Sequence, residues 1–91
     1  MTNTNKIKEL IRIAQEANVR VERGNMIRWD ADVAGKQYRY NIKKNVIRRE
    51  IRSFNSSVWT RIDSCKISGV VLQSWEYLMK DLAEKQNIFS A

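Results

Sequence analysis

Apolar and polar residues alternate between positions 19 and 42, and this alternation constrains the fold more than any other feature of the chain. Successive side chains of a β-strand point to opposite faces, so a period of two predicts strands with one apolar face. Gly24 and Asn25 suit a two-residue hairpin turn, and Ala34 and Gly35 suit a second turn. The sequence therefore predicts a three-stranded antiparallel meander. Its expected apolar face consists of Val19, Val21, Ile27, Trp29, Ala31, Tyr38, Tyr40 and Ile42.

Helical periodicity flanks the meander on both sides. Between residues 5 and 17, apolar side chains recur at steps of three and four, which predicts an amphipathic helix. After a break at Gly69, residues 71–82 give the strongest helical signal of the chain. Both helices are expected to cover the aromatic face of the sheet. A weaker apolar edge of the last helix, formed by Val70 and Tyr77, suits a homodimer contact.

Residues 45–66 are also predicted to be helical. Their apolar residues follow steps of three and four, as in a narrow helical stripe. Asn55, Ser56 and Ser57 have poor helix propensity, and they leave open whether the segment is one helix or two. The expected fold is therefore α+β: an N-terminal helix, a three-stranded antiparallel meander, then two or three helices that include the C-terminal amphipathic helix (α-β-β-β-α-α).

The chain is short enough for one small domain. No repeat, linker or proline divides it, so we expect a single domain over residues 1–91 with loose ends at 1–4 and 87–91. The longest apolar run, residues 70–72, is far shorter than the roughly 20 residues of a membrane span, so no membrane contact is expected. The single cysteine, Cys65, favours a reducing, cytoplasmic location.

Positive charge is concentrated in residues 36–52. This stretch contains seven lysines and arginines and one acid, Glu50, so it contributes +6 of the net charge of +7. Like charges at this density repel one another, and a polyanion is the usual partner that compensates them. The predicted nucleic-acid-binding residues are Lys36, Arg39, Lys43, Lys44, Arg48, Arg49 and Arg52, with Arg20 and Arg28 as a secondary basic surface on the polar face of the meander.

In the helix predicted over residues 45–66, Arg48, Arg49 and Arg52 would form a basic ridge. The lysine pair just before this helix would lie beside backbone N–H groups that can themselves bind phosphate. Arginine predominates in the ridge, which favours bidentate contacts with phosphate or guanine. The sequence does not distinguish DNA from RNA, or single from double strands.

Sequence signals for catalysis are sparse. The chain has no histidine and one cysteine, which excludes zinc fingers, histidine general bases and thiol redox pairs. Its three glycines lie at predicted junctions and leave no phosphate-binding loop. Asp30 and Asp32 alternate along a strand and are a weak signal for a metal site, so we expect turn or salt-bridge roles for them and no metal or cofactor. The sequence predicts a small basic nucleic-acid-binding module without enzymatic activity.

Two other functions are open. A small inhibitor, such as those that phages use against a host defence or replication enzyme, would bind a host protein or nucleoprotein complex through the same basic surface. A metal-free RNA-cleaving toxin would use arginine, lysine and tyrosine side chains, for which Tyr38, Arg39 and Tyr40 are candidates. Two tyrosines in phase with apolar residues are, however, more typical of a core.

Overall fold

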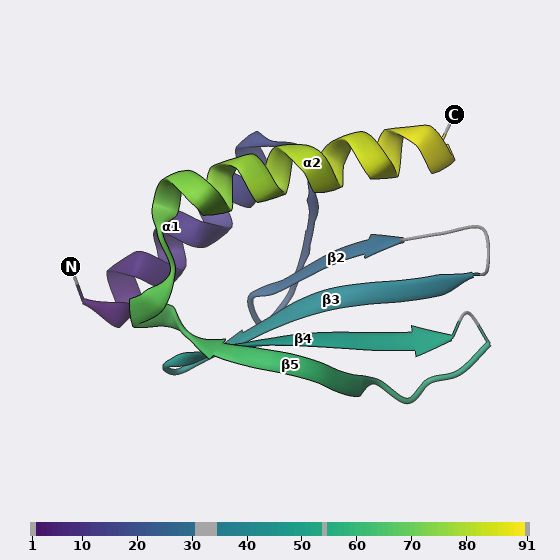
Figure 1. Cartoon of the computed structure of the whole chain (residues 1–91), viewed down its shortest axis with the longest axis horizontal. Helices are drawn as coiled ribbons and strands as arrows, with labels where there is room; N and C mark the ends of the chain where they lie inside the picture. The colour runs from purple at the N-terminus through teal and green to yellow at the C-terminus, as the bar shows by residue number, and fades with distance from the viewer. Residues whose placement is uncertain (1, 31–34, 54, 91) are drawn as a thin grey trace.

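Two α-helices lie on the same side of a five-stranded antiparallel sheet in the computed structural model, which describes residues 2–30, 35–53 and 55–90, the side chains of residues 30 and 86–90 excepted (Figure 1). The strands follow one another across the sheet in chain order, β1-β2-β3-β4-β5. The elements are α1 (Asn3–Glu16), β1 (Arg20–Glu22), β2 (Met26–Asp30), β3 (Lys36–Lys43), β4 (Val46–Ser53), β5 (Thr60–Lys66), the short 3-10 helix η1 (Ile67–Gly69) and α2 (Leu72–Ser90).

The predicted helix over residues 45–66 is wrong, because this segment forms strands β4 and β5. Strand β4 follows β3 through a two-residue turn at Lys44 and Asn45 and pairs with it antiparallel. Strand β5 pairs with the other edge of β4. The chain is α+β, but the predicted order α-β-β-β-α-α gives way to one N-terminal helix, five strands and one C-terminal α-helix.

The misleading pattern has a physical explanation. Ile47 and Ile51 are four residues apart, a step that puts two side chains on one face of a strand as well as on one side of a helix. The segment is rich in β-branched residues, which pack well on a pleated sheet. Pairing with β4 also satisfies the backbone N–H and C=O groups along β3, which would otherwise be a free edge eight residues long.

The turn between β1 and β2 has three residues, 23–25, rather than the predicted two. The register requires this length, because Glu22 lies opposite Met26. Gly24 and Asn25 have φ angles of 79° and 58°, and glycine and asparagine are the residues that accept this left-handed conformation most readily. Ala31 and Ala34, which belong to the predicted sheet face and second turn, lie outside the described residues.

The core lies between the helices and the aromatic face of the sheet. Trp29 stacks on Tyr38 at a ring-centroid distance of 5.7 Å and makes a tilted contact with Tyr40 at 4.8 Å. Tyr40 contacts Trp75 of α2 at 5.3 Å. The indole Nε1–H of Trp75 donates a hydrogen bond of 3.0 Å to the backbone oxygen of Leu10 in α1. The buried apolar residues are Leu10, Ile13, Ala14, Val19, Ile27, Trp29, Ile42, Ile47, Ile67, Trp75, Met79 and Leu82.

Helix coverage of the sheet is uneven. Helix α1 packs on β1 and α2 packs on β2, whereas every residue of β5 is exposed. Within the described residues, no helix combines the length and apolar character needed to cross a membrane.

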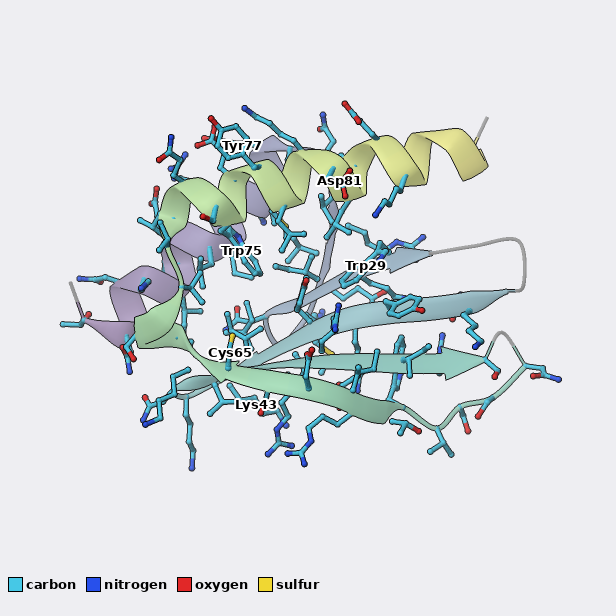
Figure 2. All side chains as sticks on the ribbon, in the orientation of Figure 1. Trp29, Lys43, Cys65, Trp75, Tyr77 and Asp81 are labelled. Carbon is cyan, nitrogen blue, oxygen red and sulfur yellow. The ribbon has the colours of Figure 1, made fainter. Side chains whose placement is uncertain are left out.

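The ends of the helices bear on two further predictions. Helix α1 begins at Asn3, and the Thr2 hydroxyl accepts a hydrogen bond of 3.2 Å from the backbone N–H of Asn5. That the chain ends, residues 1–4 and 87–91, are loosely held stays a prediction. Val70 packs against the core, whereas Tyr77 is 64% exposed on the outer side of α2 (Figure 2). The homodimer contact predicted for these two side chains stays a prediction.

Replacing Ile47 by alanine tests the strand assignment. Ile47 is 2% exposed and Ile62 is 44% exposed, whereas a single helical stripe would bury both alike. We expect I47A to lower the free energy of unfolding by about 2–5 kcal/mol, because a buried cavity forms. We expect I62A to lower it by less than about 1 kcal/mol. Urea unfolding measures both, and equal losses would contradict the strand assignment.

Candidate nucleic-acid interface

Arginine side chains dominate the sheet face that points away from the helices. Alternate residues of each strand lie on this face, in antiphase with the core residues Ile27, Trp29 and Ile42. Figure 2 shows Lys43 on this side of the sheet, with Trp29 and Trp75 on the other side. The described side chains that the strand register places on the open face are those of Arg20, Glu22, Met26, Arg28, Gln37, Arg39, Asn41, Lys43, Val46, Arg48, Glu50, Arg52, Arg61, Ser64 and Lys66.

One cross-strand row of the open face contains a charged residue from every strand. Each member lies opposite the next in the register of the sheet. Arg49 of β4 lies opposite Asp63 of β5, but the next residue, Glu50, lies opposite Arg61. The residue between Arg61 and Asp63 has no partner on β4 and forms a β-bulge. Counting described side chains only, the open face carries eight cations against the two carboxylates Glu22 and Glu50. The row reads Arg20, Arg28, Arg39, Glu50 and Arg61.

The structure divides the predicted basic residues between the two faces. Arg49 lies opposite Tyr40 on the helix-facing side, and its Nη2 is 2.6 Å from Oδ2 of Asp63. Lys36 has the same helix-facing register as Tyr40, and Lys44 lies in the β3–β4 turn. The residues brought together on the open face are Arg39, Lys43, Arg48 and Arg52 of the main set and Arg20 and Arg28 of the secondary set.

The predicted ridge of Arg48, Arg49 and Arg52 is wrong. Consecutive residues of a strand point to opposite faces, so Arg48 and Arg49 lie on opposite sides of β4. The predicted phosphate site at a helix N-terminus is wrong as well, because Lys43 and Lys44 precede a strand and no helix.

The sequence does not predict three residues of the open face: Arg61, Lys66 and Trp59. All three belong to residues 45–66, whose apolar spacing predicts a helix. Trp59 immediately precedes β5, and its ring centroid lies 4.3 Å from Cζ of Arg39 and 4.6 Å from Cζ of Arg52. The sequence does contain one signal for this part of the site, because Trp59 and Arg61 are spaced two residues apart. This spacing places both side chains on one sheet face only if the segment is a strand.

Hydrogen bonds hold three of the arginines in place. The Gln37 side-chain oxygen accepts from Nε of Arg52 at 2.7 Å and from Nη2 of Arg28 at 2.8 Å. Oε1 of Glu50 accepts from Nε of Arg39 at 2.7 Å, and the Glu50 side chain is only 11% exposed. Guanidinium groups fixed in this way lose less conformational entropy when they bind an anion.

Some cations of the open face are ion-paired, including Arg20, whose Nη1 is 3.9 Å from Oε1 of Glu22. Arg28 pairs with Glu22 at 3.2 Å and Arg39 with Glu50. By contrast, four exposed cations have no carboxylate within ion-pair distance among the described side chains. They are Lys43, Arg48, Arg61 and Lys66.

The residues predicted for RNA cleavage do not converge. Tyr38 and Tyr40 contact Trp29 on the helix-facing side, whereas Arg39 pairs with Glu50 on the open face. Burial raises the pKa of the Tyr40 phenol, and the nearby Arg49 opposes this rise.

The side chains that could bind a metal ion do not form a cluster in the described residues. Among the described residues, no three His, Cys, Asp or Glu side chains cluster closely enough to hold a metal ion. Asp32 and the side chain of Asp30, the weak metal signal of the sequence, lie outside the described part of the chain.

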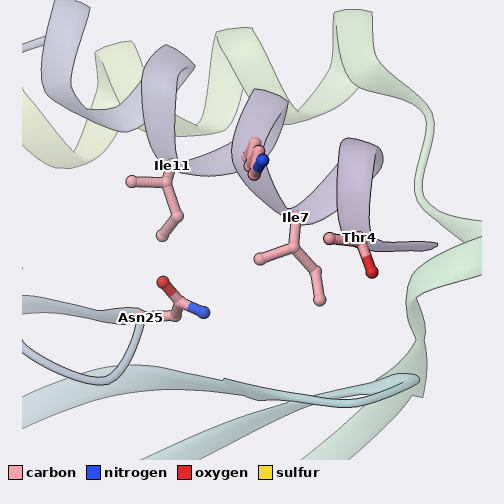
Figure 3. A pocket seen from close by; sticks show the side chains of 5 residues that line it. Thr4, Ile7, Ile11 and Asn25 are labelled. Carbon is pink, nitrogen blue, oxygen red and sulfur yellow. The ribbon is translucent and has the colours of Figure 1, made fainter. Parts of the chain in front are cut away.

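A groove of about 330 Å³ separates α1 from the β1–β2 turn (Figure 3). It is lined by Thr4, Ile7, Lys8, Ile11 and Asn25, which include no pair of acid and base groups.

No known protein family, curated protein or solved structure matches this chain. The open face must therefore be interpreted from its own geometry and charge.

Tyr40 makes stability sensitive to alkaline pH. Its pKa in the folded protein lies above the ordinary value of 10.0, because burial disfavours the phenolate. The unfolded chain loses this proton first, so the free energy of unfolding falls as the pH rises through about 10. We expect urea unfolding between pH 8 and pH 11 to show a smaller loss for Y40F than for the parent protein.

The exposed Tyr77 provides the control for this measurement. Y77F should follow the pH dependence of the parent protein. A Y40F variant that loses stability as steeply as the parent would contradict the assignment to Tyr40.

Proposed function

We propose that the open face binds the phosphate backbone of nucleic acid, and that the protein is a nucleic-acid-binding module without enzymatic activity. The supporting observation is that cations from all five strands gather on the sheet face that neither α-helix covers. Strands lie roughly 4.8 Å apart, so the row from Arg20 to Arg61 is about 19 Å long. A row of this length can contact several consecutive phosphates of one nucleic-acid strand.

Residue type supports phosphate as the ligand. Six of the eight cations of the open face are arginines, whose planar guanidinium can donate two parallel hydrogen bonds to one phosphate. Arg28, Arg39 and Arg52 are held by Gln37 and Glu50, which suits defined contacts. The four cations free of ion pairs supply the longer-range attraction to a polyanion.

The proposal includes no catalytic step and places the protein in the cytoplasm. The carboxylate beside Arg39, Glu50, is already ion-paired and also accepts a hydrogen bond from the side-chain amide of Asn41. The thiol of Cys65 is exposed, and a reducing compartment keeps such a thiol from forming disulfides between molecules.

A protein partner is the second candidate. Tryptophan and arginine are the residue types that most often dominate the binding energy of protein interfaces, and Trp59 lies among three arginines. A phage-type inhibitor would use this face to bind an acidic surface of a host protein or nucleoprotein complex. Titration with DNA and RNA at two salt concentrations separates the two functions. Affinity that falls steeply with salt supports nucleic acid, and absence of binding at low salt supports the inhibitor.

Removing Arg48 and Arg61 together tests the proposed interface. Both are exposed on the open face and neither belongs to the core, so R48A/R61A should fold normally. We expect nucleic-acid affinity to fall at least about tenfold, and the slope of log affinity against log salt to shrink by about 1.5 to 2, since two phosphate contacts are lost. Fluorescence anisotropy with a labelled oligonucleotide measures both quantities.

The matched control is R12A/R49A. It also removes two positive charges, but one is on α1 and the other is on the helix-facing side of β4. We expect its affinity to change by less than about threefold, because only long-range attraction is reduced. Equal losses in the two double variants would show that net charge, rather than the open face, determines binding.

A further inference from the structure

Trp59 differs from the other two tryptophans of the chain in its surroundings. Trp29 and Trp75 are 6% and 4% exposed in the core, whereas Trp59 is only partly buried. Its ring lies against the guanidinium groups of Arg39, Arg52 and Arg28, with centroid to Cζ distances of 4.3, 4.6 and 5.8 Å. Within the described chain, the core and both α-helices lie on the far side of the sheet, so they do not cover this ring.

Arg39 and Arg52 retain N–H donors that make no hydrogen bond within the described residues. Nε of Arg52 donates to Gln37, but its two Nη groups make no hydrogen bond within the described residues. Arg39 uses Nε for Glu50 and Nη1 for a weak contact with the Met26 sulfur at 3.4 Å. A partly exposed aromatic ring thus lies beside N–H groups that are available to an anion.

A cation–π role alone does not fully account for this arrangement. Such contacts are worth about 0.5–2 kcal/mol each, and they explain why the ring rests on guanidinium groups. They do not explain why a large apolar side chain stays partly in water on a polar face. An apolar surface next to fixed cations fits a ligand that is itself both flat and anionic, which describes a nucleotide.

The width of the sheet discriminates between nucleic-acid forms. The major groove of a DNA duplex is about 12 Å wide and admits a helix or a two-stranded ribbon. A five-stranded sheet face, whose row of charges is about 19 Å long at the usual strand spacing, is too wide to enter it. Bases inside a duplex are also stacked on one another and do not offer a free face to Trp59. Unpaired bases can turn out of the strand and stack on an aromatic side chain.

We propose that Trp59 stacks on an unpaired base of single-stranded nucleic acid while Arg39 and Arg52 bind the adjacent phosphates. This inference rests on the proposed function and adds its ligand class. RNA and DNA both contain bases and phosphodiester groups, so the experiment below tests a single strand of each. Arg28, third beside the ring, extends the phosphate contacts toward β1.

The first experiment compares W59L with the parent protein. The ligands are uridine and thymidine oligonucleotides of about 15 nucleotides, within the range of single-stranded binding sites. We expect W59L to bind both at least about fivefold more weakly, because the stacked base is lost. W59F keeps a ring and should lose less affinity than W59L. Y77L, which removes an exposed aromatic side chain from the outer side of α2, is the matched control and should bind like the parent.

Inorganic polyphosphate separates stacking from charge, because it carries phosphates without bases. The W59L substitution should leave polyphosphate affinity within about twofold of the parent value, since the arginines are retained. Tryptophan fluorescence gives a second measurement, independent of W59L folding. Single strands should quench the emission of the parent protein, W59F should lose most of this quenching, and a duplex of the same sequence should quench little.

The outcomes distinguish the inference from the function on which it rests. If oligonucleotide binding is unchanged in W59L but weakened in R48A/R61A, base stacking is rejected and phosphate binding stands. Equal affinity for duplex and single strand, with no quenching, also rejects the inference. If neither oligonucleotides nor polyphosphate bind the parent protein, the proposed function itself is rejected.

Discussion

Trp75 connects the three parts of this fold through two contacts. Its ring lies on Tyr40 of the sheet, and its indole N–H donates to the Leu10 backbone oxygen in α1, while its own backbone belongs to α2. A buried indole N–H without a partner would cost free energy, so this hydrogen bond fixes where the two helices cross. Both helices are thereby held on the aromatic face, over β1 and β2. The opposite face remains uncovered, and everything proposed about function depends on that.

Strand alternation converts one basic stretch into two different surfaces. Residues 36–52 are nearly uniform in charge along the sequence. In the sheet, Arg48 lies on the same face as Arg20 of β1 and Arg61 of β5, whereas Arg49 pairs with Asp63 on the other face. The surface that results owes as much to residues outside the basic stretch as to those within it. Sequence-local charge density is therefore a good indicator that a cationic face exists and a poor guide to its members.

The sequence was sufficient where local periodicity is unambiguous. The helices α1 and α2 and the strands β1, β2 and β3 occupy segments whose apolar spacing predicted those element types. It failed at residues 45–66, since the step from Ile47 to Ile51 fits both periods and the choice between them depends on pairing with β3. The one-residue bulge that aligns Arg61 with Glu50 is a further non-local feature. The position of Trp59 over the arginines depends on both, so neither it nor the row of charges could be predicted.

Glu50 shows that the open face is ordered rather than simply maximally charged. The nearly buried carboxylate of Glu50 lowers the net attraction of the open face for a polyanion, yet its hydrogen bond holds Arg39 beside Trp59. With Arg28 and Arg39 already paired to Glu22 and Glu50, mainly Arg52 and the four cations free of ion pairs are available to replace counterions. About five released counterions correspond to a salt slope near -3.5 on a single strand. Electrostatic attraction on that scale is moderate, so under the proposed function the contacts of Trp59 and its arginines would supply much of the affinity and the selectivity.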